Sequence, residues 1–276
     1  MTKTTRGALS RSRTKGPILF SSTMTPDAPR AVVGIVHGYA DYADRYDHVQ
    51  RAWAEQNLAS IAIDLRGHGH AEGARGRCLA FSEYHDDVEE LFALLERMDL
   101  PIFLFGHSFG GLVCASWVLE KPNAQKALVL SSPYMRTALD VPAIKKRAGR
   151  IVSAILPSVG LASGLRGAQM THDEARAKFY DEDPLSFKTA NARWFVESER
   201  AQADVMARAK DITLPLYVAI GTADPVVAGG RELYEAAGSA DKTLDVREGL
   251  FHEVLNEPGE GPKIARAMAD WMLARA

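Results

Sequence analysis

Short apolar runs alternate with longer amphipathic stretches along most of the chain. The runs lie at 31–37, 60–65, 101–105, 127–131, 214–220 and 244–247. Helical spacing of apolar residues occurs between and after them, at 46–57, 82–98, 110–120 and 262–276, with Ser82 expected to cap the second of these helices. This alternation predicts βαβ units and a mostly parallel sheet. Because the runs are continuous, we expect helices to cover both faces of the sheet.

The alternation of strands and helices breaks between Pro133 and Pro215. No strand is expected there, whereas 141–159, 173–180 and 191–210 have helical spacing. We therefore expect an α/β core formed by 1–135 and 212–276, with a helical cap over 136–211 inserted between the later strands. The alternative is a helical insertion that packs on the core without covering a site.

Composition and charge are those of an ordinary globular protein. Among 276 residues, 46% are hydrophobic and 25% are charged. The net charge of −2 offers no electrostatic basis for nucleic-acid binding. Two cysteines, Cys78 and Cys114, are too few for a disulfide framework. The first 20 residues have no apolar signal-peptide core and no run is long enough to span a membrane, so we expect a cytoplasmic protein.

The segment 101–111, PIFLFGHSFGG, carries the candidate nucleophile. An apolar strand leads into Gly106-His107-Ser108-Phe109-Gly110, and a helix follows. Gly-x-Ser-x-Gly between a strand and a helix is typical of a nucleophile elbow, whose tight turn needs small residues on both sides of the serine. The N–H groups of the following helix favour negative charge at this point. The alternative is a glycine-rich turn that only packs the helix on the strand.

A serine nucleophile needs a base, and the base needs an acid that orients it. Only His172 and His252 follow Ser108, and His252 lies just after the last predicted strand, at the sheet edge where Ser108 is expected. Asp224 directly follows the run at 214–220 and is the expected acid. The other acidic candidates do not end a strand: Asp211, Asp241 and Glu253.

Two backbone N–H groups are needed to bind the oxyanion of the tetrahedral intermediate. We expect them from Phe109, which follows the nucleophile, and from Tyr39, which follows the first clear strand. His37 is expected to be a structural histidine bonded beneath this loop. His68 and His70 flank a glycine, but no carboxylate or thiol nearby completes a metal site, so no metal is expected.

These motifs together resemble the α/β-hydrolase superfamily, and in detail its monoacylglycerol lipase and lysophospholipase branch. The similar segments are IVHGYADYADRYDHV at 35–49, DLRGHGHAEGARG at 64–76, FGHSFGG at 105–111 and FHEVLNEP at 251–258. The resemblance covers about 30–258. It implies a Ser108–Asp224–His252 triad, oxyanion donors at Tyr39 and Phe109, an apolar acyl tunnel under a mobile cap, and no cofactor.

The expected activity is hydrolysis of a lipid-like ester, with monoacylglycerol ranked before lysophospholipids and short esters. The apolar stretch 151–165 could line an acyl tunnel or touch a membrane surface, with the basic residues of 145–150 near head groups. Ordinary cap packing explains the stretch equally well. A peptidase remains an alternative because acidic residues occur at 181–183, 197 and 199; a non-catalytic binding protein would need a damaged triad. Substrate contacts are expected from Gly38, His107, Ile151, Ile155, Leu156 and Val226.

Overall fold

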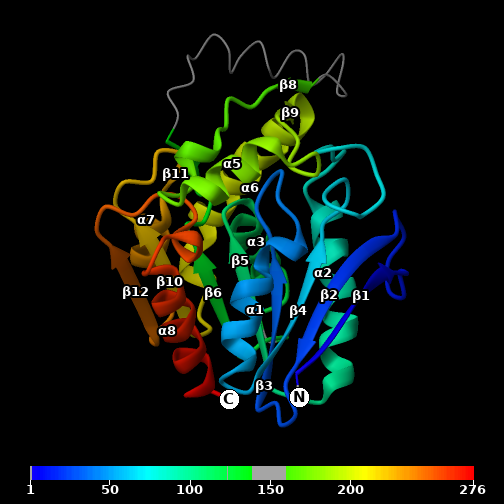
Figure 1. Ribbon diagram of the computed structural model, residues 1–276, viewed down its shortest axis with the longest axis vertical. Helices are drawn as coiled ribbons and strands as arrows, with labels where there is room; N and C mark the ends of the chain where they lie inside the picture. Colours follow the sequence, from blue (N-terminus) through cyan, green and yellow to red (C-terminus); the bar gives the residue numbers. More distant parts are fainter. Residues whose placement is uncertain (1, 123, 139–159) are drawn as a thin grey trace.

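The computed structural model describes residues 2–122, 124–138 and 160–276 (Figure 1). Its main sheet has eight strands in the order β1-β2-β4-β3-β5-β6-β10-β12. The first two pairings are antiparallel and the others are parallel, which confirms the predicted mostly parallel sheet. The strands are β1 (Lys3–Leu9), β2 (Leu19–Thr25), β3 (Ala31–Val36), β4 (Leu58–Asp64), β5 (Ile102–His107), β6 (Ala127–Ser131), β10 (Leu216–Gly221) and β12 (Lys242–Arg247).

Helices cover both faces of this sheet, as the continuous apolar strands predict. On one face α1 (Asp47–Ala54) packs against α8 (Gly261–Leu273). The other face is covered by α2 (Ser82–Leu95), α3 (Phe109–Glu120) and α7 (Gly230–Ala236). The central strands are buried along their whole length, so each face forms its own apolar core.

The antiparallel hairpin of β1 and β2 has no counterpart in the sequence prediction. β1 is almost entirely exposed, and therefore lacks the apolar pattern that identifies a strand. Its connection to β2 is held by α2, where the Glu90 carboxylate accepts N–H bonds from Ser12, Arg13 and Thr14 at 2.6–2.8 Å. A carboxylate of another element thus orders this loop, which no local pattern reveals.

The expected capping role of Ser82 is wrong. Phe81 is the N-cap of α2 and already has right-handed helical geometry, with no side-chain cap bond. A turn precedes the helix, in which the Glu83 N–H donates to the Ala80 carbonyl at 3.2 Å. Ser82 therefore lies one residue inside the helix, where its hydroxyl cannot act as the cap.

The chain between β6 and β10 contains the predicted helices α5 (Glu174–Glu182) and α6 (Ala192–Arg208), capped by Asp173 and Asn191. The expectation of no strand there is wrong, because two antiparallel pairs use it. They are β7 (Arg136–Thr137) with β11 (Val227–Ala228), and β8 (Gly160–Ala162) with β9 (Thr189–Asn191). Strands of two or three residues are too short to produce a periodic pattern. The helical face expected over 141–159 lies outside the described residues.

This inserted segment lies beyond the carboxyl ends of the parallel strands. Figure 1 shows α5, β8 and β9 above the sheet, on the side opposite both chain termini. α6 packs against α3, the helix that follows β5. In the part of the chain that the structure describes, no helix has the length and apolar character needed to cross a membrane.

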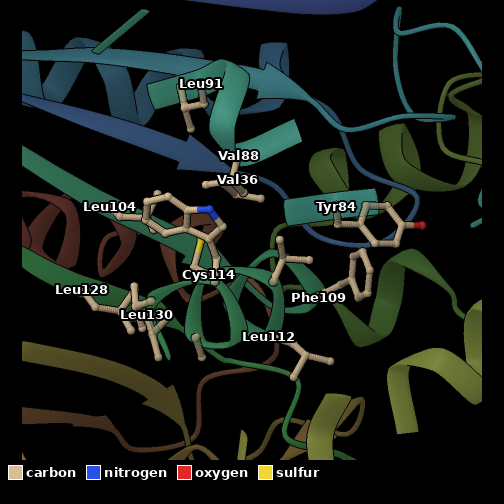
Figure 2. Close-up of a cluster of buried hydrophobic side chains, with 14 of the residues drawn as sticks. Val36, Tyr84, Val88, Leu91, Leu104, Phe109, Leu112, Cys114, Leu128 and Leu130 are labelled. Carbon is tan, nitrogen blue, oxygen red and sulfur yellow. The ribbon is translucent and has the colours of Figure 1, made fainter. Parts of the chain in front are cut away.

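The packing of α2 on β3 gives a direct test of the core (Figure 2). Leu91 of α2 is fully buried, and its Cδ2 would lie 2.9 Å from a Cβ added at Gly34 of β3. Leu91→Ala should lower the free energy of unfolding by about 2–5 kcal/mol, because the close-packed neighbours cannot collapse into the space. Leu94→Ala, on the partly exposed side of the same helix, is the control and should cost clearly less. Urea denaturation measures both; equal losses would contradict this packing.

Candidate active site

Ser108 occupies a strained turn between β5 and α3. Its backbone has φ 52° and ψ −117°, in the region of positive φ that non-glycine residues seldom adopt. Two hydrogen bonds hold the turn: the Ser108 N–H donates to the Ser131 carbonyl, and the Tyr134 N–H donates to the Ser108 carbonyl, each at 2.9 Å. The strain therefore lies at the predicted nucleophile, as the elbow motif predicts.

The two glycines of the motif are required by close backbone approach. A Cβ at Gly106 would lie 2.5 Å from the Gly110 carbonyl oxygen, and one at Gly110 would lie 2.2 Å from the Val36 carbonyl oxygen. Both distances are far below van der Waals contact. The small residues on each side of Ser108 are thus what allows β5, α3 and the end of β3 to meet.

The three predicted triad residues come together at the carboxyl edge of the sheet. His252 Nε2 lies 2.9 Å from Ser108 Oγ, and His252 Nδ1 lies 2.8 Å from Asp224 Oδ2. The second oxygen, Asp224 Oδ1, accepts N–H bonds from Val226 at 2.8 Å and Val227 at 3.1 Å. With Nδ1 protonated towards Asp224, Nε2 is placed to accept the serine proton.

Burial and pairing set the protonation states of this chain of groups. Burial alone would raise the pKa of Asp224, but His252 and the N–H bonds outweigh it and lower that pKa. Burial would lower the pKa of His252, yet the charge and hydrogen bond of Asp224 raise it, with smaller contributions from Glu253 and Asp41. The site therefore favours an ionised Asp224 and stabilises the imidazolium form of His252.

The other sequence candidates for base and acid have other partners. His172 Nδ1 is 3.0 Å from a carboxylate oxygen of Glu257, and its ring stacks on Phe251 at 3.7 Å. Asp241 pairs with Arg275, and Glu253 pairs with Arg45. Among the weighed candidates, the structure brings Asp224 and His252 to Ser108.

The loop after β3 lies directly beside the nucleophile. A Cβ at Gly38 would be 3.3 Å from Ser108 Cβ, so the backbone at Gly38 approaches Ser108 closely. The Tyr39 N–H follows on this loop, and the Phe109 N–H begins α3. His37 is structural, as predicted: its Nε2 accepts the Leu65 N–H at 3.0 Å and its Nδ1 lies 2.7 Å from the Gly38 carbonyl.

The side chains of Tyr39 and Phe109 belong to an aromatic layer under α6. Trp194 of α6 stacks on Tyr39 with ring centroids 3.7 Å apart, and it lies 5.2 Å from Phe109. Phe109 also meets Tyr84 edge to face at 5.0 Å within the buried cluster of Figure 2. Sequence reasoning placed Trp194 on a helix but had no signal linking it to Ser108, since the contact joins residues far apart in the chain.

The remaining predicted substrate residues have varied surroundings. His107 is buried behind the elbow: its Nδ1 lies 3.1 Å from the Ser131 carbonyl, and its ring centroid lies 4.9 Å from that of His252. Burial, reinforced by the nearby His252, lowers the pKa of His107 to about 4. Val226 is buried with Met170 and Tyr180. The other three predicted contacts lie outside the described residues: Ile151, Ile155 and Leu156.

The histidines of the loop at 66–70 have different environments. The His68 ring is buried 5.1 Å from the Phe187 ring, its Nδ1 lies 2.9 Å from the Arg66 carbonyl, and burial lowers its pKa to about 3. The half-exposed His70 packs against Phe20 instead. Each ring thus has a packing role on a separate side of the loop.

A family profile described as serine aminopeptidase, S33 (Hydrolase_4) matches residues 27–259. The chain belongs to this family. It is 31% identical over 254 residues to phospholipase YtpA of Bacillus subtilis, covering 90% of this chain and 98% of that one. It is 29% identical over 283 residues to a monoacylglycerol lipase of Mycolicibacterium smegmatis, covering 99% of each.

Solved structures of related enzymes have the same fold. The crystal structure of Paleococcus ferrophilus monoacylglycerol lipase superposes with a TM-score of 0.86 at 25% identity, over 94% of this chain and 99% of that chain. The α/β-hydrolase fold predicted from the sequence is thereby confirmed. Family and relatives together make the chain a carboxylic-ester hydrolase.

The tight packing at Gly106 gives a test of the elbow. Overpacking of a core typically costs about 1–3 kcal/mol of the free energy of unfolding. Gly106→Ala should cost more than this, because its methyl group clashes with backbone atoms, which cannot move aside as a side chain can. It should also strongly slow the labelling of Ser108 by a fluorophosphonate. Gly7→Ala is the control, since a Cβ there meets nothing within 4 Å. A folded Gly106→Ala protein that is labelled at the wild-type rate would refute this account of the turn.

Proposed function

We propose that this protein hydrolyses monoacylglycerols through an acyl-enzyme formed on Ser108. The observation that carries the proposal is the continuous chain from Ser108 Oγ through His252 to Asp224, with contacts of 2.9 and 2.8 Å. This chain begins at Ser108, whose strained backbone at φ 52° is the conformation expected of a nucleophile elbow. A non-catalytic binding protein would have no need of it.

The proposed chemistry follows from the positions of these groups. Ser108 Oγ attacks the ester carbonyl carbon while His252 Nε2 takes its proton. The N–H groups of Tyr39 and Phe109 bind the resulting oxyanion. His252 then gives the proton to the glycerol oxygen as the C–O bond breaks, which leaves the acyl group on Ser108. A water molecule, deprotonated by His252, releases the fatty acid and restores the serine. Throughout, Asp224 orients the imidazole and stabilises its cation.

The segment 136–211 is proposed as the cap over this site, with the core formed by 1–135 and 212–276. Two contacts support this assignment. Trp194 of α6 lies against Tyr39 and against Phe109, the residue after Ser108. Tyr180 of α5 packs with Met170 and with Val226, which follows Asp224 by two residues. An apolar wall contributed by the inserted segment suits an acyl chain better than a polar substrate.

The choice of monoacylglycerol rests on the relatives. Several of them are named as monoacylglycerol or monoglyceride lipases, and one as a phospholipase, so lysophospholipids are the second candidate. Short esters are the third. The peptidase alternative, which the name of the serine aminopeptidase family also suggests, is less favoured because acidic groups of the insert already have partners. Glu197 pairs with Arg200, and Asp183 accepts the Tyr42 hydroxyl at 2.6 Å.

One set of assays tests both the nucleophile and the substrate. Ser108→Ala should abolish hydrolysis of p-nitrophenyl esters and of monoacylglycerols, with a loss of about 10⁶-fold in kcat. For the wild type, kcat/KM should be highest for monoacylglycerol among a panel that includes lysophosphatidylcholine, short esters and an aminoacyl amide. Residual turnover by Ser108→Ala at the wild-type rate would refute the nucleophile, and preference for another panel member would refute the substrate.

The raised pKa of His252 sets the direction of the pH dependence. The base must be neutral to accept the proton of Ser108, so kcat/KM should fall as the pH drops through the pKa of His252. Asp224→Asn removes the charge that raises this pKa. Its acidic limb should therefore move to lower pH, while the plateau falls by about 10³–10⁴-fold because the imidazole loses its orienting partner. An acidic limb at unchanged pH in that variant would contradict the role of Asp224.

A further inference from the structure

A second set of buried charges adjoins the catalytic histidine. Glu253 immediately follows His252, and both of its carboxylate oxygens lie 2.9 Å from Arg45 Nη2. Arg45 Nη1 donates to Asp41 Oδ1 at 3.0 Å. The three side chains are 6–8% exposed. This Asp41–Arg45–Glu253 cluster joins the loop after β3, which carries the proposed oxyanion donor, to the loop that carries the base.

Further bonds fix each carboxylate of the cluster. Asp41 Oδ2 accepts the Tyr46 hydroxyl at 2.9 Å and the Gly38 N–H at 3.4 Å. Glu253 Oε2 accepts an Asn256 side-chain N–H at 2.5 Å, and the Glu253 N–H donates to the Met170 carbonyl at 2.7 Å. The charges are therefore held in place from both loops and from the inserted segment.

The cluster shares a small cavity with His107, the neighbour of His252. About 20 Å³ of space, enough for one water molecule, is lined by Asp41, Arg45, Glu253 and His107 among others. The His107 ring lies next to His252, with centroids 4.9 Å apart. Because the low pKa of His107 keeps it neutral, it adds no opposing charge between the cluster and His252.

The cluster carries a net negative charge. Burial opposes the ionisation of Asp41, but the Arg45 guanidinium and the N–H bond from Tyr42 outweigh it and lower the pKa of Asp41 below the usual value. Burial likewise disfavours the charged form of Arg45, yet Glu253 and Asp41 raise its pKa. Two carboxylates share one guanidinium, so one negative charge is left over. The hydroxyl of Tyr46 donates to Asp41, which delocalises that charge without neutralising it.

We propose that the Asp41–Arg45–Glu253 cluster is a positioning device for His252, which fixes its loop and supplies a net negative charge that favours the imidazolium formed during catalysis. The proposal rests on the function proposed above, in which His252 is the base. Glu253 and Asp41 act through His252, in addition to Asp224, and do not touch the substrate in this scheme. Both raise the pKa of His252, after the larger effect of Asp224.

The charged and titratable groups around His252 come from every element that packs against it. They are Asp224 after β10, His107 and Ser108 at the end of β5, and Glu253 on its own loop. Asp41 and Arg45 come from the loop after β3, and Tyr180 of α5 has its ring 5.3 Å from the Arg45 guanidinium. Lys188 lies over the same ring, 3.7 Å from its centroid.

The sign of the effect separates this role from a purely structural one. Glu253→Gln keeps the side-chain shape but brings the cluster to zero net charge, so the pKa of His252 should fall by about 0.5–1 pH unit. Arg45→Gln leaves the carboxylates without their cation, so the pKa should rise. If the cluster only held the two loops together, both variants would be less stable but the pKa of His252 would not change.

The titration is followed directly by NMR of protein labelled with ¹⁵N-histidine, with His252 assigned by its absence in His252→Gln. The acidic limb of kcat/KM is measured in parallel. Glu260→Gln is the matched control. It removes the same charge from a partly exposed position at the start of α8, where Glu260 pairs with Arg247 and Lys263, and it should leave the pKa of His252 unchanged.

Each result decides the proposal. A lower pKa of His252 in Glu253→Gln, without a lower pKa in Arg45→Gln, supports the proposal. An unchanged pKa of His252 in folded Glu253→Gln overturns the proposal. If Glu253→Gln does not fold, Asp41→Asn replaces it, and an unchanged pKa of His252 in Asp41→Asn overturns the proposal in the same way. The NMR measurement needs no turnover, so inactivity of the wild type towards esters would count against the proposed function alone.

Discussion

The strained backbone of Ser108 is the constraint on which the rest of the site depends. A non-glycine residue at φ 52° is unfavourable by about 1–3 kcal/mol and persists only where its surroundings over-determine it. Here the surroundings are the ends of two neighbouring strands and the start of a helix. β6 accepts the Ser108 N–H, β3 lies against Gly110, and α3 begins at the next residue. The strain turns the serine hydroxyl out of the sheet, towards the loops that follow β3, β10 and β12.

The parallel sheet explains why these loops meet. Since parallel strands all end at the same edge, residues separated by more than 100 positions converge there without any local attraction between them. Ser108 and His252 are 144 residues apart and lie in contact. The same edge gathers Gly38, Asp224 and the buried Asp41–Arg45–Glu253 cluster, and Trp194 of α6 stacks on Tyr39 there. The residues of the candidate site and the helix that packs next to them therefore lie at the same edge of the sheet.

The electrostatic design balances burial against pairing. His252, Asp224, Asp41 and Arg45 are all withdrawn from water, which by itself would oppose their charged forms. Each charge is kept by a partner at hydrogen-bond distance. Because few waters are available to screen them, small changes in this arrangement act strongly on the histidine, whereas ion pairs on the exposed surface contribute little.

The sequence by itself determined the order of the parallel strands and of the helices between them, and it located the elbow and the three residues of the proposed triad. Each of these has a local signature: an apolar run, glycines two residues from a serine, or an acid or histidine just after a strand. Only the tertiary structure decided the rest. The hairpin of β1 and β2 is exposed, the strands of the insert are two or three residues long, and Phe81 already has helical geometry before Ser82, so local patterns were absent or misleading. Trp194 and the Asp41–Arg45–Glu253 cluster owe their roles to contacts between distant segments, which no local spacing of residues can specify.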